Sequence, residues 1–172
     1  MAHERRACMF DRRQKINFTC ALVCAGMLGY AIYAEKYLGF TPCPLCMFQR
    51  VCIGALGLVF LIAALHPVRR VGAAIYGVLV FLAAGAATWV AGRHVWIQHQ
   101  PHGTVPACGA PLDTLLDMLP VLEVIRKVMT GGGECGVVDW AFLGISMPGW
   151  VLISAVALGL VGIVNNFTPG RR

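Results

Sequence analysis

Four long stretches of this 172-residue chain are apolar and almost free of charge. They comprise residues 16–34, 51–68, 71–92 and 140–168. Each is long enough to hold a membrane-spanning helix, because a bilayer core needs about 20 apolar residues and tolerates roughly 17. The chain as a whole is 58% hydrophobic and only 13% charged, and a soluble domain of this size has too small a core to hide so much apolar surface. The sequence therefore predicts an all-α membrane protein.

We expect one integral membrane domain over residues 1–172, built as a bundle of four transmembrane helices. The four spans are predicted at about 16–34, 51–67, 71–92 and 147–166. The two outer loops are predicted at about 35–50 and 93–146. The first run also has the features of a cleaved signal peptide, since basic residues precede it and it ends in Ala31-Ile-Tyr-Ala34. Three further hydrophobic segments follow it, which favours a retained helix.

The positive charges predict how the chain is oriented in the membrane. Most of the 14 Lys and Arg residues lie before the first span, between the second and third spans, or at the C-terminus: Arg5, Arg6, Arg12, Arg13, Lys15, Arg69, Arg70, Arg171 and Arg172. By the positive-inside rule these segments are cytoplasmic, so both termini face the cytoplasm and both outer loops lie on the outer side of the membrane. The net charge of +6 follows from this bias and needs no nucleic-acid partner.

The eight cysteines divide between the loops and the rest of the chain. Cys43 and Cys46 lie in the first outer loop, and Cys108 and Cys135 lie in the second. Two pairs that face an oxidising compartment predict two disulfides. The other four cysteines are interpreted as ordinary residues of the cytoplasmic tail or of helix packing: Cys8, Cys20, Cys24 and Cys52.

The spacing of the first pair indicates redox chemistry. Cys43-Pro-Leu-Cys46 is a Cys-x-x-Cys motif in a short polar break between two apolar runs, and the residues after Cys46 are predicted to begin a helix. A helix N-terminus favours a thiolate. Arg50 follows four residues after Cys46, so it shares that face of the helix and brings a positive charge near a sulfur anion or an electron acceptor.

The second outer loop is predicted to contain a short amphipathic helix. Leucines recur at helical spacing opposite acidic residues: Leu112, Leu115, Leu116, Leu119 and Leu122. Pro120 is expected to break or kink this run. Such a helix either lies on the membrane surface or packs on its own protein, and the sequence favours neither. Cys108 and Cys135 flank it beside proline- and glycine-rich segments, which we expect to be flexible enough for thiol–disulfide exchange.

Several motifs together have a known counterpart. They are Cys43-Pro-Leu-Cys46 followed by Arg50, the segment Arg93-His-Val-Trp-Ile-Gln98, the pair Cys108 and Cys135, and Trp140-Ala-Phe-Leu-Gly-Ile-Ser-Met-Pro-Gly-Trp150. Over most of its length the chain resembles the DsbB family of disulfide-generating proteins. This resemblance implies a thiol:quinone oxidoreductase that reoxidises a periplasmic thioredoxin-fold partner of the DsbA type and passes the electrons to ubiquinone or menaquinone in the lipid bilayer.

The resemblance also implies roles for the four loop cysteines. Cys108 is expected to form the mixed disulfide with the partner, and Cys135 is its mate. Cys43 and Cys46 are the pair that quinone reoxidises. During transfer Cys43 captures Cys135 in a disulfide between the loops, which leaves Cys46 as a thiolate against the quinone ring.

Two further residues are implied in quinone binding. Arg50 would stabilise the thiolate and the reduced ring, and His94, near the outer end of the third span, matches a quinone-site residue of the family. The alternative for His94 is an interfacial histidine that is satisfied by water.

Three other functions remain open at the level of the sequence. One is a quinone-linked thiol oxidoreductase of the vitamin K epoxide reductase type, which the motifs around Arg50 and the fourth span argue against. Another is a membrane protein with a tetrahedral zinc site made by the four loop cysteines, although we expect no metal, because there is no second Cys-x-x-Cys. The third is a scaffold with two structural disulfides.

Overall fold

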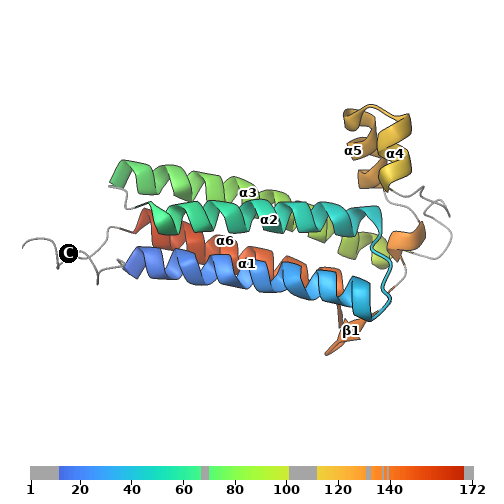
Figure 1. Ribbon diagram of the computed structural model, residues 1–172, viewed down its shortest axis with the longest axis horizontal. Helices are drawn as coiled ribbons and strands as arrows, with labels where there is room; N and C mark the ends of the chain where they lie inside the picture. Colours follow the sequence, from blue (N-terminus) through green and yellow to red (C-terminus); the bar gives the residue numbers. More distant parts are fainter. Residues whose placement is uncertain are drawn as a thin grey trace, which may run out of the picture.

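Four long helices form an elongated bundle (Figure 1). The computed structural model describes residues 12–66, 70–100, 112–130, 133–136, 138 and 140–168. The bundle helices are α1 (Arg12–Tyr37), α2 (Pro44–Leu65), α3 (Arg70–Gln98) and α6 (Met147–Phe167). Within the described residues, these four are long and apolar enough to cross a membrane. The prediction of an all-α, four-helix membrane bundle is confirmed. We call the end at which α2 begins the dithiol end, because it carries Cys43 and Cys46.

The smaller elements all gather at the dithiol end (Figure 1). They are α4 (Leu112–Met118), α5 (Val121–Thr130), the 3-10 helix η2 (Gly133–Gly136) and the strands β1 (Ala141–Phe142) and β2 (Ile145–Ser146). Pro120 separates α4 from α5, as a proline without an amide hydrogen is expected to do. Helical structure then continues to Thr130, beyond the predicted leucine run.

One face of the α4–α5 pair packs on the protein itself. Leu115, Val124 and Val128 are buried in a cluster that also contains Leu45 of α2 and Ile97 of α3. Other large apolar side chains of the pair are exposed: Leu116, Met118, Val121 and Leu122. Of the two alternatives for the amphipathic helix, the structure supports packing on the protein for the face that carries Leu115, Val124 and Val128.

Small residues let the bundle helices approach closely. A Cβ added at Gly162 of α6 would lie 2.6 Å from the ring of Phe60 in α2, and one added at Gly159 would lie 2.8 Å from the Cβ of Ala84 in α3. Such contacts are typical of membrane helices, whose association depends on close packing because lipid is as apolar as the side chains. Cys24 is 1% exposed within the same core, which agrees with its interpretation as a packing residue.

A buried asparagine cluster joins α1 to α6 at the opposite end of the bundle. Asn17 and Asn166 are 0% and 3% exposed, and the side-chain amide of Asn17 donates to Asn166 Oδ1 at 3.3 Å. Asn165 donates to Asn17 Oδ1 at 3.0 Å. A polar group within a membrane needs such partners. This cluster fixes how α1 and α6 face each other, and the sequence analysis did not single it out.

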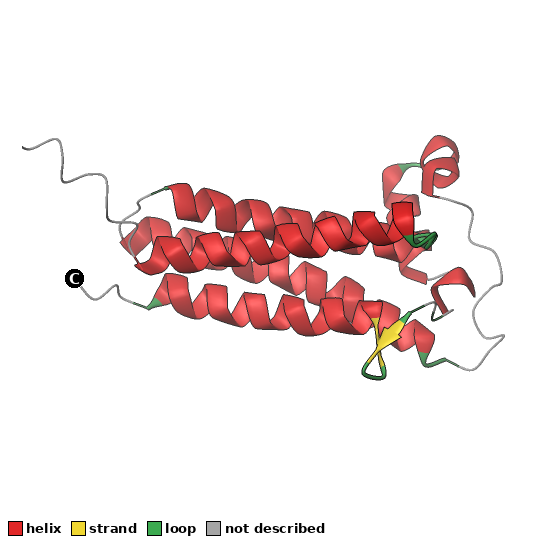
Figure 2. Cartoon of the chain, turned by 60° about the horizontal axis from the view of Figure 1, so that its bottom comes forward, coloured by secondary structure: helices red, strands yellow, loops and turns green. Residues whose placement is uncertain are grey.

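A β-hairpin precedes α6 and projects from the side of the bundle (Figure 2). No strands were expected in this region from the sequence. Ala141 pairs with Ser146 and Phe142 pairs with Ile145, and the turn between them places Leu143 at φ 53° and Gly144 at φ 76°. Positive φ at both central residues is the geometry of the turns that suit a two-residue hairpin. The hairpin was not predicted because leucine is unusual at a turn position with positive φ.

Candidate active site

Cys43 and Cys46 lie at the N-terminus of α2. Cys43 is the N-cap residue, and Pro44 occupies the first turn, where a proline is well tolerated because its missing N–H would have no helical partner. The two cysteines are thiols in this structure, and the Cys43 thiol donates to Cys46 Sγ at 3.3 Å. Cys43 is buried and Cys46 is half-buried. This hydrogen bond and the helix N-terminus both stabilise a thiolate on Cys46.

His94 of α3 lies directly beside the dithiol. Its Nε2 is 3.8 Å from Cys43 Sγ, and its Nδ1 is 3.0 Å from Nε2 of Gln49. His94 is 1% exposed and Gln49 is 4% exposed. A continuous polar chain therefore runs from Gln49 through His94 and Cys43 to Cys46. The interpretation of His94 as a histidine satisfied by interfacial water is wrong, because Gln49 and Cys43 surround its ring nitrogens.

Gln49 was not identified from the sequence. A signal for it existed, because Gln49 follows Cys46 by three residues and so lies on the same face of α2. A glutamine in a largely apolar helix is also unusual, since a buried amide requires a partner. The identity of that partner, His94 on another helix, is visible only in the structure.

Arg50 links α2 to α1 at the next turn. Its guanidinium donates to the carboxylate of Glu35 and to the carbonyl oxygen of Ala31 at 3.0 Å. Glu35, which falls at the start of the predicted outer loop at about 35–50, instead lies within α1, because that helix extends to Tyr37. The pair is partly exposed, with 21% of the Arg50 side chain and 40% of the Glu35 side chain accessible.

A pocket of about 120 Å³ opens between the bundle helices at the dithiol end. The polar part of its wall consists of eight side chains: Glu35, Thr41, Cys43, Cys46, Gln49, Arg50, His94 and Gln98. Much of the remaining wall is apolar, with Met27 and Leu28 of α1, Ile53 of α2 and Met147 and Val151 of α6. The pocket is similar in volume to the ~150 Å³ cavities that hold a benzene ring in other proteins. It therefore suits a small aromatic or quinonoid ring with a reactive sulfur in its wall.

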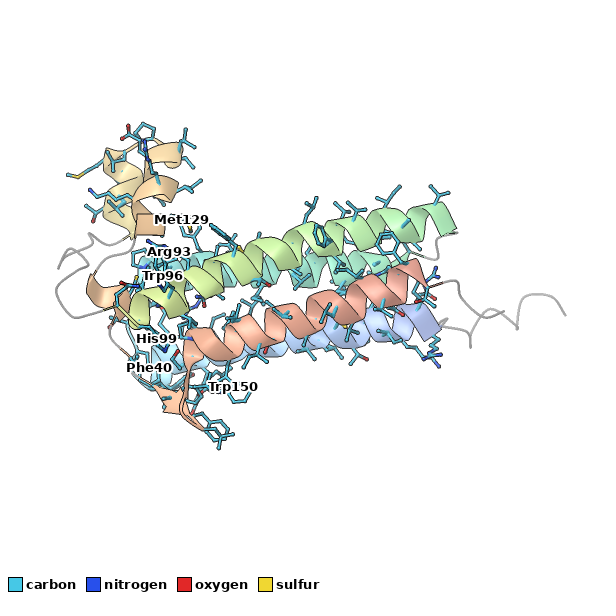
Figure 3. All side chains as sticks on the ribbon, turned by 180° about the vertical axis from the view of Figure 1, so that it is seen from behind. Phe40, Arg93, Trp96, His99, Met129 and Trp150 are labelled. Atoms are coloured by element: carbon cyan, nitrogen blue, oxygen red, sulfur yellow. The ribbon has the colours of Figure 1, made fainter. Side chains whose placement is uncertain are left out.

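Aromatic side chains surround the dithiol end. Phe40 lines the pocket and lies at the same end of the bundle as Trp96, His99 and Trp150 (Figure 3). Trp150 donates from its indole nitrogen to the carbonyl oxygen of Phe142 in the hairpin at 3.2 Å. Tryptophan at this level is typical of a membrane–water interface.

Cys135 lies close to the first cysteine pair. It belongs to η2, is 2% exposed, and shares a buried cluster with Cys43, with Cys46 packed against it. The side chain of Cys135 is buried because η2 packs against α3, and the expected flexibility of its segment stays a prediction. Cys108 and the pairing predicted for it lie outside the described residues.

Comparison with known proteins identifies the family. The family description "Disulfide bond formation protein DsbB" matches residues 12–165. The chain belongs to the DsbB family. Membership in this family indicates that the chain acts in disulfide-bond formation as an oxidoreductase and has transmembrane helices. It favours the resemblance found in the sequence over the zinc, scaffold and vitamin K epoxide reductase alternatives.

Curated relatives match the chain over most of its length. The "Disulfide bond formation protein B" of Xylella fastidiosa strain 9a5c is 47% identical over 152 residues, which cover 88% of this chain and 88% of the relative. The proteins of the same name from Xanthomonas euvesicatoria pv. vesicatoria strain 85-10 and Xanthomonas oryzae pv. oryzae strain MAFF 311018 are 47% and 48% identical over 151 residues, and each match covers 87% of this chain and 88% of the relative. No solved structure matches the chain significantly.

Proposed function

We propose that this protein reoxidises a periplasmic thioredoxin-fold dithiol oxidase of the DsbA type and passes the electrons through two cysteine pairs to a membrane quinone. Disulfides would thereby be generated de novo. The observation that carries this proposal is the Cys43–Cys46 dithiol, which forms one wall of a ring-sized pocket at the end of an apolar bundle.

The pocket fits a quinone ring by its chemistry. Cys46, Arg50 and His94 line it together with apolar side chains of α1 and α6, and such a mixture is typical of a site that orients a mostly apolar ligand by a few polar groups. Ubiquinone and menaquinone both have a planar ring and an apolar tail that partitions into lipid. A bound quinone supplies an acceptor for two electrons and two protons, which is what a dithiol releases when it closes to a disulfide.

Cys46 is the sulfur best prepared to react with that acceptor. It is half-buried and accepts the hydrogen bond of Cys43, and it lies in the first turn of α2, where the helix N-terminus favours a negative charge. Arg50 adds a permanent positive charge to the same pocket. Cys46 and Arg50 would hold the ring, with His94 at its edge.

The burial of Cys135 beside Cys43 supports an exchange between the two cysteine pairs. Because both belong to one buried cluster, a thiolate on one needs only a short movement to attack a disulfide that includes the other. In the proposed order, the partner's thiolate attacks Cys108 of a Cys108–Cys135 disulfide, which forms the mixed disulfide and releases Cys135 as a thiolate. Cys135 then attacks Cys43 of a Cys43–Cys46 disulfide. Cys46 is thereby left as the thiolate that faces quinone.

The proposed location is the bacterial inner membrane with both termini in the cytoplasm. Arg13 and Lys15 begin α1 at the end of the bundle opposite the dithiol. The end of α2, the start of α3 and the end of α6 lie at that same end (Figure 1). The positive-inside rule places this end in the cytoplasm, so the dithiol end faces the periplasm, where a disulfide persists.

The test is oxidation of a reduced DsbA-type protein by the purified membrane protein with ubiquinone or menaquinone as the acceptor. We expect one quinone to be reduced for each disulfide formed. Cys46→Ser should abolish quinone reduction. Cys135→Ser, mixed with the partner in its disulfide form, should trap a covalent complex, because the Cys108 thiolate attacks the partner's disulfide and no Cys135 remains to resolve the product. Partner oxidation without quinone reduction, or a complex formed through Cys46, would contradict the proposal.

A further inference from the structure

The reduced site brings three metal-binding atoms together. Sγ of Cys43 lies 3.3 Å from Sγ of Cys46 and 3.8 Å from Nε2 of His94, and all three atoms lie within 4.8 Å of one another. We infer that the reduced protein binds a divalent zinc-like cation at these three atoms, and that the bound metal holds the dithiol in its reduced form.

The geometry is close to that of a tetrahedral zinc site. With Zn–S bonds of about 2.3 Å and a Zn–N bond of about 2.0–2.1 Å, neighbouring ligand atoms are separated by roughly 3.5–3.8 Å. The two separations at Cys43 differ from these values by a few tenths of an ångström. The sulfur of Cys46 and Nε2 of His94 lie within 4.8 Å of each other, so side-chain rotations of the three residues would complete the set. Two cysteines and one histidine, with the fourth position open, are a known zinc arrangement.

Gln49 supplies the outer contact that a metal-bound histidine needs. A histidine that binds a metal through one ring nitrogen almost always donates the hydrogen of the other to a fixed acceptor. The side-chain amide of Gln49 lies 3.0 Å from Nδ1 of His94, and a half-turn of the amide presents its oxygen to that nitrogen. Both side chains are almost fully buried, so the ring is already oriented with Nε2 toward Cys43.

Charge balance also favours a dication here. The cation displaces the thiol protons of Cys43 and Cys46, so two thiolates and a neutral imidazole form a complex without net charge. Burying a neutral complex is far less unfavourable than burying an isolated ion. Arg50, the nearest fixed cation of the pocket, is itself paired with Glu35. The three ligands line the pocket, which leaves space for water as the fourth ligand.

The site exists in only one redox state. A disulfide between Cys43 and Cys46 has no thiolate to offer, so oxidation removes two of the three ligands and metal binding keeps the pair from closing. No electron is transferred to or from the metal. The consequence for turnover, a slower return to the disulfide, rests on the proposed function, whereas metal binding itself needs neither quinone nor partner.

The experiment uses the full chain in detergent, reduced with a phosphine that is then removed, and titrated with Co²⁺ as a spectroscopic substitute for zinc. We expect one Co²⁺ per chain, with sulfur-to-cobalt absorption in the near ultraviolet and the visible bands of a tetrahedral ion, and displacement by Zn²⁺. The chain oxidised at Cys43–Cys46 should give neither signal.

Variants assign the ligands. Cys43→Ser and His94→Ala should each weaken Co²⁺ binding and change its spectrum. Gln49→Leu should weaken it by about 10–100-fold. Gln49→Glu should preserve it, because a carboxylate accepts the same hydrogen, and this conservative change guards against a general packing defect. Cys52→Ser, in the same helix, is the matched control and should bind as the unaltered chain does.

Three results would overturn the inference: equal binding by the oxidised chain, unchanged binding after His94→Ala, or loss of binding in Cys135→Ser, which would place a different sulfur in the site. Partner oxidation is measured separately. A chain that oxidises its partner through quinone but never binds Co²⁺ refutes the metal site alone. A chain that binds Co²⁺ but reduces no quinone refutes only the proposed function.

Discussion

Replacing Arg50 with methionine should impair quinone use far more than it destabilises the protein. The side chain donates to the Glu35 carboxylate and to the carbonyl oxygen of Ala31. Because 21% of the Arg50 side chain and 40% of the Glu35 side chain are exposed, solvent screens this ion pair, and its loss should lower the free energy of unfolding by at most about 1 kcal/mol. Inside the pocket, a hydrogen bond from the Arg50 guanidinium to the Cys46 thiolate or to the reduced quinone ring would contribute about 1.5–3 kcal/mol. Its loss corresponds to a decrease of roughly 10–150-fold in the rate of quinone reduction.

The assay is steady-state oxidation of the partner with each substrate varied in turn. Arg50→Met should lower kcat/KM for quinone by that factor and leave the apparent affinity for the partner near its original value. Arg50→Lys should cause a smaller loss, because an ammonium keeps the charge but not the planar fork of donors.

Glu35→Gln is the matched control for the ion pair. It removes the carboxylate and leaves the guanidinium in the pocket, so it should cost much less quinone activity than Arg50→Met. The reasoning fails if Glu35→Gln is as damaging as Arg50→Met, or if Arg50→Met alters only the dependence on the partner.

Three further outcomes follow from the packing and the charges. Leu143→Gly should raise the melting temperature in detergent, because a left-handed backbone costs leucine about 1–2 kcal/mol and the side chain is 77% exposed; an unchanged or lower value would show that the leucine is compensated. Gly162→Ala should lower the melting temperature, since its Cβ would lie 2.6 Å from an aromatic ring, whereas Gly26→Ala, with nothing within 4 Å, should not; equal effects would contradict the packing argument. A periplasm-active reporter should be inactive when fused after residue 70 and active near residue 132, and the reverse pattern would refute the proposed orientation.

The membrane bundle and the position of the dithiol were predictable because both depend on local patterns. Apolar runs of about 20 residues are sufficient to indicate a span. The helix was expected to begin after Cys46, and α2 begins slightly earlier, at Pro44, where a proline is well tolerated. The spacing from Cys46 to Arg50 is one helical turn, so their shared face also follows from the sequence. These predictions need no knowledge of which helix packs against which.

Contacts between helices were decided only by the tertiary structure. The pairing of Gln49 with His94, the burial of Cys135 in one cluster with Cys43, and the Arg50–Glu35 ion pair each join different helices of the chain. The rotation of one helix against another sets such contacts, and that rotation depends on close packing at small residues spread over the whole bundle. A local pattern describes which face of a helix a residue occupies, but only the packed bundle determines what that face meets.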